Sequence, residues 1–482
     1  MGKSRLRRRI VLGLLILILA AGAYVGYKNR EFIEQLPIGS GVKAKTLATS
    51  LFLQGRDEAT VLAEDIGYHP LFKYFKARVD RERRTVSVSF LAPGLFKKKA
   101  VYLDQLGTVL LNGGVKEKDV RAWKPNIPAP EPADAAARPW PEGDLLPEAP
   151  DFEGIDRSAL SAALDKVFAE PDPDRLKRTR AVVVVKDGRL IAERYAPGIA
   201  PDMPLIGWSM SKSVTSALVG ILVGQGKLDV QAPAPVPEWS DPQDPRHAIT
   251  LHQLLQMCPG LEWYEEYADH PVSDVNRMLF MKGDMAAYAA AKPLKNPPGM
   301  VFEYSTGTTL LINRIIRAVI GGQDEYWAFP RRALFNRIGM RTAVVEPDAS
   351  GTFSGGSYVY ASARDWARFG LLYLNDGVWA GERILPEGWV AYTVTPSPAA
   401  KEGDYGAQFW LNRGPFGAPE KRTYKSLPED IFCCDGYQGQ FIAIVPSARL
   451  VVVRLGMTWK GDWGTEDLIR DVMAAVQNKE IL

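Results

Sequence analysis

Cysteine and histidine are scarce in this chain of 482 residues. Three cysteines are too few for a disulfide framework, and they do not fix the redox compartment. The four histidines show neither an HExxH pattern nor a Cys/His ligand spacing, so we expect neither a metal nor a cofactor. The cysteines are Cys258, Cys433 and Cys434, and the histidines are His69, His247, His252 and His270.

A surplus of one charge sign is also missing. The chain has 59 basic and 56 acidic residues, a net charge of +3. Five of the positive charges lie within residues 3–9, so the remainder carries about 3 − 5 = −2. Because nucleic-acid binding depends on a broad basic surface, DNA and RNA are not expected partners. A hydrophobic content of 46% with 24% charged residues indicates a globular protein, long enough for two or three domains.

One long hydrophobic run is present, at residues 10–27, IVLGLLILILAAGAYVGY, between basic flanks. As a helix it would extend roughly 27 Å, close to the ~30 Å of a bilayer core. The heavier basic flank precedes it, which predicts a cytoplasmic tail and signal-anchor helix over residues 1–30. The rest of a single-pass membrane protein would then lie on the extracytoplasmic, periplasmic side. The small residues Ala20, Ala21, Gly22 and Ala23 leave open a cleaved signal peptide and a secreted protein.

Changes in composition divide the rest of the chain into regions. Residues 31–123 mix short apolar stretches with charges, and the alternation at 84–90 predicts a strand in a small N-terminal region. Residues 124–154 are rich in Pro, Ala and acids and predict a linker, or a segment lying over a surface. The main domain is expected at 155–482, where hairpins at 181–195 and 441–453 enclose mostly helical sequence. This order predicts an α+β fold in which helices flank an antiparallel sheet, with an inserted helical region.

A nucleophile is predicted at the start of an apolar helix. Ser209 and Lys212 lie three residues apart in GWSMSKS, so their side chains share one helical face. A lysine that loses part of its hydration can become neutral enough to deprotonate a serine. The spacing alone is weak, because Ser40 and Lys43 repeat it, and a helix cap with a solvated lysine is the alternative interpretation.

Two further motifs supply groups that acyl transfer needs. Tyr304 follows a tight turn and precedes an apolar helix, and a phenol near Lys212 could relay a proton; a packed structural tyrosine is the alternative. Residues 436–440, GYQGQ, enter a strand, where glycine permits close approach of a substrate and a backbone N–H could stabilise an oxyanion. A glycine-rich turn without function is the other interpretation of this segment.

These motifs, in this order, resemble the penicillin-recognising serine hydrolases. Residues 155–482 are similar to the class C β-lactamase family, closest to its 6-aminohexanoate-dimer hydrolase and esterase branches, with further likeness at 249–261, 335–340 and 365–370. The resemblance implies a β-lactamase-like fold in which Ser209 is acylated, Lys212 accepts its proton and Tyr304 acts as acid and base. It also implies that the backbone N–H groups of Ser209 and Gln440 bind the oxyanion.

Departures from the family pattern bear on the substrate. Thr306 stands where many relatives have Asn, and Tyr437, Gln438 and Gly439 stand where β-lactamases and cell-wall peptidases often have Lys-Thr-Gly. We expect these four residues to contact the substrate. Without the cation, a carboxylate-bearing substrate loses a charge partner, which favours hydrolysis of a small amide or ester.

Other functions remain open at this point. A D,D-peptidase or β-lactamase acting on cell-wall-type substrates is one alternative, and a non-catalytic, membrane-tethered binding protein on the same fold is another. A Ser-His-Asp hydrolase is disfavoured, because Ser209 lies in GxSxS and no histidine follows His270.

Overall fold

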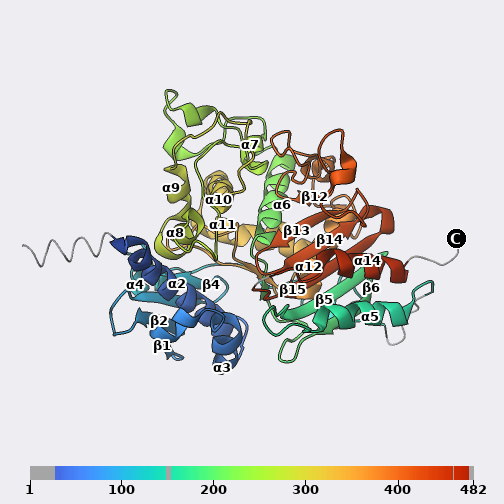
Figure 1. The fold of residues 1–482 in the computed structure, drawn as a ribbon. Helices are drawn as coiled ribbons and strands as arrows, with labels where there is room; N and C mark the ends of the chain where they lie inside the picture. The colour runs from blue at the N-terminus through green and yellow to red at the C-terminus, as the bar shows by residue number, and fades with distance from the viewer. Residues whose placement is uncertain (1–27, 148–152, 460, 477–482) are drawn as a thin grey trace, which may run out of the picture.

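The computed structural model describes residues 28–147, 153–459 and 461–476. Figure 1 shows a blue N-terminal region, a sheet formed by green-cyan and red strands, and a green-to-yellow helical region on one side of that sheet. Helices and antiparallel sheets are combined in one main domain. The predicted α+β architecture of the main domain is therefore confirmed.

The central sheet joins the beginning and the end of the main domain. Its strands run in the order β12-β13-β14-β15-β5-β6, and neighbouring strands are antiparallel. The middle strands are rich in Val and Ile because both of their faces are buried. The strands are β5 (Thr179–Lys186), β6 (Arg189–Tyr195), β12 (Trp410–Leu411), β13 (Phe432–Gly436), β14 (Gln440–Val445) and β15 (Leu450–Gly456).

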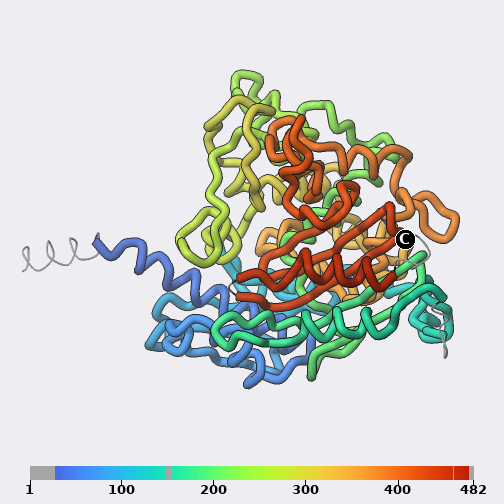
Figure 2. The backbone as a smooth tube through the Cα atoms, turned by 45° about the vertical axis from the view of Figure 1, so that its right-hand side comes forward, coloured from blue at the N-terminus to red at the C-terminus, as the bar shows by residue number. Residues whose placement is uncertain are grey.

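Helices cover both faces of this sheet. Val182 and Val452 face α5 (Arg157–Phe168) and α14 (Thr465–Val476), whereas the alternate residues Val183 and Val451 face α12 (Ala363–Leu374). The helix α6 (Met210–Gly224) lies on the same side as α12 and contacts β13 and β14. Figure 2 shows the red C-terminal hairpin beside the cyan-green start of the domain, although the helical region separates them in sequence.

The helical region is inserted between β6 and β12. A small sheet of order β7-β9-β8 connects it to the central sheet, and β10 and β11 form a separate hairpin. The helices are α7 (Leu251–Leu255), α8 (Asp274–Met281), α9 (Met285–Ala290), α10 (Thr306–Ile320), α11 (Gln323–Pro330) and α13 (Trp389–Thr393). The short strands are β7 (Leu205–Ile206), β8 (Val344–Val345), β9 (Val359–Ala361), β10 (Val378–Trp379) and β11 (Glu382–Arg383).

The N-terminal region packs a long helix on a small sheet. The helix α2 (Arg30–Phe52) covers an antiparallel sheet of order β1-β2-β3-β4 and also contacts α8 of the main domain. Lys45 of α2 forms an ion pair of 2.5 Å with Glu346 of the main domain, and both side chains are buried. The other elements are α3 (Glu58–Val61), α4 (Glu117–Arg121), β1 (Phe75–Asp80), β2 (Thr85–Phe90), β3 (Lys98–Leu103) and β4 (Gly107–Leu110).

The proline-rich segment, as far as residue 147, lies against the main domain. The guanidinium of Arg368 on α12 donates hydrogen bonds to the carbonyls of Pro141 and Gly143, and the indole of Trp140 donates to the carbonyl of Gly188. The Arg368 guanidinium also lies over the Trp140 ring, 4.6 Å from its centroid. The segment is thus anchored by backbone hydrogen bonds and an aromatic contact.

The prediction of a single-pass membrane protein requires correction. Within residues 28–147, 153–459 and 461–476, no helix combines the length and the apolar character that crossing a bilayer requires. The structure therefore does not support the predicted localisation. The run at residues 10–27, on which that prediction rested, lies outside the described residues.

Candidate active site

Ser209 and Lys212 meet at the start of α6. Ser209 precedes the first helical residue, and Lys212 follows one turn later on the same face. The Lys212 Nζ lies 2.9 Å from Ser209 Oγ, 2.8 Å from Thr306 Oγ1 and 3.0 Å from the carbonyl oxygen of Gly356. Lys212 is only 1% exposed, so its ammonium has exchanged water for these groups.

A strained turn presents Ser209. Trp208 has a φ of +45°, a left-handed conformation that is costly for a bulky residue. Its indole N–H donates to Gln438 Oε1 at 3.2 Å, and the N–H of Gly207 donates to the Val359 carbonyl at 2.8 Å. These contacts hold the turn, and α6 behind it is buried along most of its length.

Thr306 connects Lys212 to a carboxylate that the sequence did not single out. Ser305 caps α10 by accepting from the N–H of Thr308, which places Thr306 on the first turn. The Thr306 hydroxyl donates to Glu265 Oε1, and its N–H donates to Glu265 Oε2 at 2.9 Å. Glu265 also accepts from the indole of Trp263 at 2.5 Å. The carboxylate is therefore fixed by several donors.

This arrangement orients the amine of Lys212. The Gly356 carbonyl can only accept a hydrogen bond, and the Thr306 hydroxyl, whose proton goes to Glu265, must accept from Lys212. A neutral amine has two N–H groups and one lone pair. With both N–H groups directed to Thr306 and Gly356, the lone pair faces Ser209 Oγ. Lys212 is thus held in the orientation of a general base for Ser209.

The pKa of Lys212 suits this task. Burial lowers the pKa of Lys212 to about 8, and the negative charge of Glu265 opposes that shift. Roughly a quarter of the amines are then neutral at pH 7.5. The lysine is a usable base near neutral pH while Glu265 limits how far its pKa falls.

The ring of Tyr304 lies next to the ammonium group of Lys212. Its ring centroid is 4.8 Å from Lys212 Nζ, and it packs on Trp410 with the centroids 5.2 Å apart. Burial raises the pKa of Tyr304 above its ordinary value, while a hydrogen bond with Ser209 acts in the opposite direction. The phenol is therefore protonated at neutral pH and can donate a proton.

The strand β13 runs directly beside the nucleophile. A Cβ on Gly436 would lie 2.2 Å from the carbonyl oxygen of Gly207 and 3.1 Å from Ser209 N, so only glycine fits there. The Gly436 carbonyl accepts from the N–H of Gly439 at 3.2 Å, toward the hairpin. Because a trans peptide directs C=O and N–H oppositely, the N–H of Tyr437 points away from the hairpin.

The N–H of Ser209 has a related orientation. The Trp208 carbonyl accepts from Ser211 N at 2.9 Å along the helix, so Ser209 N–H points out of the N-terminus of α6. Gln440 lies differently: it is paired with Gly436 across the hairpin, and its side chain donates to the Gly456 carbonyl at 2.7 Å. The geometry favours Tyr437 over Gln440 as the second N–H near Ser209.

The remaining residues singled out in the sequence have other contacts in the structure. Gln438 contacts Trp208, and Gly439 forms the hairpin turn with a φ of +78°. Ser40 and Lys43, which share the Ser-x-x-Lys spacing, do not form a comparable pair, because Lys43 Nζ donates to the Phe72 carbonyl at 3.2 Å. Across the described ranges there is no cluster of His, Cys, Asp and Glu that could hold a metal.

Residues 164–476, about two-thirds of the chain, match the family model described as Beta-lactamase. The chain belongs to the beta-lactamase family. A curated relative of this beta-lactamase-family chain is the 6-aminohexanoate-dimer hydrolase of Paenarthrobacter ureafaciens, 27% identical over 300 residues, which cover 58% of this chain and 72% of the relative.

Solved structures resemble about two-thirds of the chain. A penicillin-binding protein homolog from Caulobacter crescentus matches with a TM-score of 0.51 and 16% identity, over 68% of this chain and 99% of that one. A family VIII carboxylesterase matches with a TM-score of 0.50 and 16% identity, over 68% and 97%. At these identities the likeness concerns the fold.

Sequence reasoning missed Glu265, Gly356 and the N–H of Tyr437. Glu265 stands beside Glu266 in a loop, and nothing in the local pattern distinguishes the two carboxylates. Gly356 and Tyr437 contribute backbone groups, which carry no residue-type signal. The Gly-Tyr-Gln-Gly segment belongs to the hairpin that packs against Ser209, where Gly436 is the residue in close contact.

Proposed function

We propose that this protein is a serine hydrolase that cleaves small, uncharged esters or amides through an acyl-enzyme on Ser209. The observation that carries the proposal is the set of contacts at Lys212 Nζ, which leave its lone pair for Ser209 Oγ. Family membership supports hydrolysis in general, while the choice of ester or amide rests on the site.

In the acylation step, neutral Lys212 removes the proton of Ser209 Oγ, and the oxygen attacks the substrate carbonyl carbon. The carbonyl oxygen becomes negative and accepts from the N–H groups of Ser209 and Tyr437. Tyr304 donates its proton to the departing oxygen or nitrogen, and the Lys212 ammonium returns a proton to the phenolate. Lys212 is then neutral again.

Deacylation repeats the sequence with water. Neutral Lys212 takes a proton from a water molecule, whose oxygen attacks the acyl carbon. The bond to Ser209 Oγ breaks, and the proton on Lys212 passes to that oxygen. One water is consumed, one acid is released, and both side chains return to their starting states.

The charges near Ser209 favour an uncharged substrate. The strand β13 presents Cys434, Asp435 and Gly436 and no cation, and burial raises the pKa of Asp435 to about 7. Asp435 is therefore partly ionised at neutral pH and would repel a substrate carboxylate. This disfavours the D,D-peptidase and β-lactamase alternatives.

The test is covalent labelling with a fluorophosphonate, followed by mass mapping of the adduct. We expect the adduct on Ser209, none in Ser209→Ala, and a fall of orders of magnitude in labelling rate in Lys212→Ala. Turnover should be measured on a p-nitrophenyl ester, a linear anilide and a chromogenic β-lactam. A folded protein that gives no adduct would indicate a binding protein, and a preference for the β-lactam would reverse the substrate assignment.

A further inference from the structure

A cavity of about 100 Å³ lies at the boundary between the N-terminal region and the main domain, beside Trp208, the residue that precedes Ser209. Trp208 and Tyr437 form part of its wall. Tyr437 follows Gly436, which lies against the backbone of Ser209. Residues of α2 form the opposite wall. The aromatic side chains that line the cavity are Tyr68, Trp208, Tyr267, Tyr358, Tyr360, Tyr437 and Trp459.

The acyl chain is the part of a substrate that this cavity suits. A tetrahedral acyl carbon has four substituents: Ser209 Oγ, the oxyanion, the leaving group and the acyl chain. The oxyanion faces the N–H groups of Ser209 and Tyr437, and the leaving group must face its proton donor, Tyr304. Trp208 and Tyr437 line the cavity, whereas Ser209, Lys212 and Tyr304 do not, so the cavity is assigned to the acyl chain and not to the leaving group.

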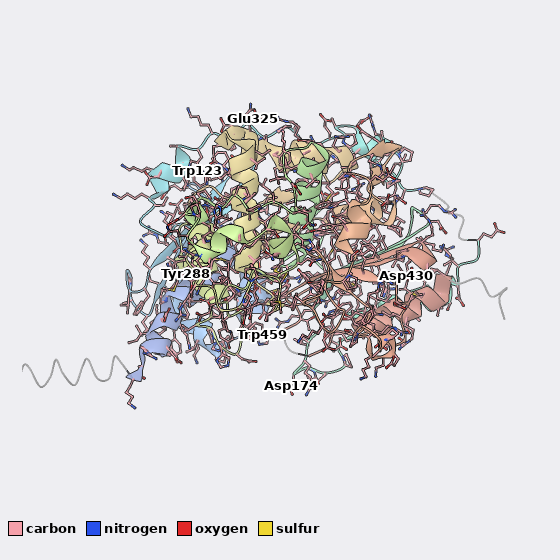
Figure 3. All side chains as sticks on the ribbon, turned by 90° about the horizontal axis from the view of Figure 1, so that it is seen from above. Trp123, Asp174, Tyr288, Glu325, Asp430 and Trp459 are labelled. Atoms are coloured by element: carbon pink, nitrogen blue, oxygen red, sulfur yellow. The ribbon has the colours of Figure 1, made fainter. Side chains whose placement is uncertain are left out.

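A second cavity of about 100 Å³ lies beside the first along α2. The two share wall residues, including Val42 and Trp459, and in Figure 3 Trp459 lies between the blue N-terminal region and the red C-terminal strands. The second cavity is lined mainly by apolar groups, among them Ile38, Leu71 and Phe75. Since an apolar cavity of about 150 Å³ binds benzene, each cavity of about 100 Å³ suits a group of about four carbons.

The charged residues in the wall of the first cavity are paired with opposite charges. The ammonium of Lys45 binds Glu346 and lies 4.5 Å from the centroid of the Tyr358 ring. Arg180 binds Asp65, which also pairs with Arg56 at 2.5 Å. A charged substrate group finds no unpaired counter-charge among these residues. The buried hydroxyl of Tyr358, 2% exposed, has no hydrogen-bond partner among the described residues and lines the first cavity.

We propose that these two cavities form an acyl-chain site, so that the N-terminal region selects esters or amides of unbranched acyl chains of about four to eight carbons. The proposal rests on the function proposed for Ser209. A butyryl chain fills the first cavity, and a longer chain passes Val42 into the second. The Tyr358 hydroxyl offers one hydrogen bond to a polar atom within the chain.

The experiment is a chain-length series of p-nitrophenyl acetate, butyrate, hexanoate and octanoate. Each buried methylene contributes about threefold to fourfold, so kcat/KM of the wild type should rise with chain length. Thr46→Phe fills the first cavity and should lower kcat/KM for butyrate and longer esters at least tenfold, while acetate is unaffected. Val42→Trp separates the cavities and should spare acetate and butyrate but lower octanoate at least tenfold.

Glu31→Phe is the matched control, because Glu31 is exposed on the same helix and lines neither cavity. It should keep the wild-type series, and thermal melting should show all three variants folded. If Thr46→Phe and Val42→Trp, folded, also keep the wild-type series, the acyl-chain site is refuted. Fluorophosphonate labelling separates the two proposals: an unlabelled wild type refutes the function, whereas a labelled wild type with a flat series refutes only the acyl-chain site.

Discussion

Replacing Glu265 by Gln should move the pH dependence of activity without dismantling the site. A glutamine oxygen can still accept from the Thr306 hydroxyl, so the acceptor that orients Lys212 is kept while the negative charge is removed. The amide NH2 replaces the oxygen that accepts from the N–H groups of Thr306 and Trp263, so these two hydrogen bonds are lost in the variant. That charge raises the pKa of Lys212 against the effect of burial. Its loss should lower the pKa of Lys212, and the base should become neutral at a lower pH.

The size of the effect follows from the pKa of about 8 for Lys212. At pH 7 about a tenth of the lysines are neutral, and a pKa lower by about one unit would make about half of them neutral. The population of active base rises about fivefold, while a weaker base transfers the proton a few-fold more slowly. Above pH 9 both proteins hold a neutral lysine, and only the slower transfer remains. Glu265→Gln should therefore be faster than the wild type below about pH 7 and slower above pH 9.

The assay is kcat/KM for p-nitrophenyl butyrate from pH 6 to 10, corrected for spontaneous hydrolysis. Glu266→Gln is the matched control, because this neighbouring carboxylate accepts from the N–H groups of Tyr267 and Ala268 and not from Thr306. Thr306→Val, which removes the acceptor for Lys212, should lower the plateau about 100-fold, and Thr306→Ser should restore it. Unchanged profiles in both Glu265→Gln and Thr306→Val would refute the orienting role of the Glu265–Thr306 pair.

Other substitutions test separate parts of the structure. Tyr304→Phe should slow acylation by esters with poor leaving groups far more than by p-nitrophenyl esters, because only poor leaving groups need its proton; equal effects in single-turnover measurements would make Tyr304 structural. Gly436→Ala should lower kcat about 100-fold or more, because its Cβ would meet the Gly207 carbonyl and displace the Tyr437 N–H; wild-type kcat would contradict the assignment of that N–H to the oxyanion. Lys45→Met should lower the free energy of unfolding, measured by denaturant titration, by about 3–5 kcal/mol, because Glu346 would remain buried without its partner. The double variant with Glu346→Gln should recover part of that loss, and a fully additive loss would show that the two residues do not interact.

Much of the main domain could be predicted because its signals are local. The apolar runs on either side of turn residues predicted the hairpins β5–β6 and β14–β15. The Ser-x-x-Lys spacing predicted the contact between Ser209 and Lys212 because residues three apart are neighbours on the surface of a helix. The identical spacing at Ser40 shows the limit of such evidence, since only the fold decides which lysine reaches its serine.

Contacts between distant parts of the chain could not be predicted in the same way. Glu265 reaches Thr306 across 41 residues of sequence, and Lys45 reaches Glu346 from a region that composition marked as separate. Neither carboxylate stands in a periodic or spaced pattern, so nothing local distinguishes it from an exposed acid. The sequence-based prediction named the N–H of Gln440 as an oxyanion donor, whereas we propose that of Tyr437, three residues earlier: the direction of an N–H depends on the hairpin turn, not on the identity of the side chain.

If Ser209 acts as proposed, the catalytic groups and the proposed acyl-chain site come from different parts of the chain. The groups near the reacting carbon all come from the beta-lactamase-family part of the chain, between Ser209 and Tyr437. The wall opposite Trp208 comes from α2, which precedes the matched residues 164–476. Among the described residues, the hydrogen bonds of Lys212 Nζ go to Ser209, Thr306 and Gly356, and none goes to α2. A change in the α2 wall can therefore alter which acyl chain fits while the Lys212 contacts stay in place. A substrate search that varies the acyl chain should consequently be more informative than one that varies the leaving group.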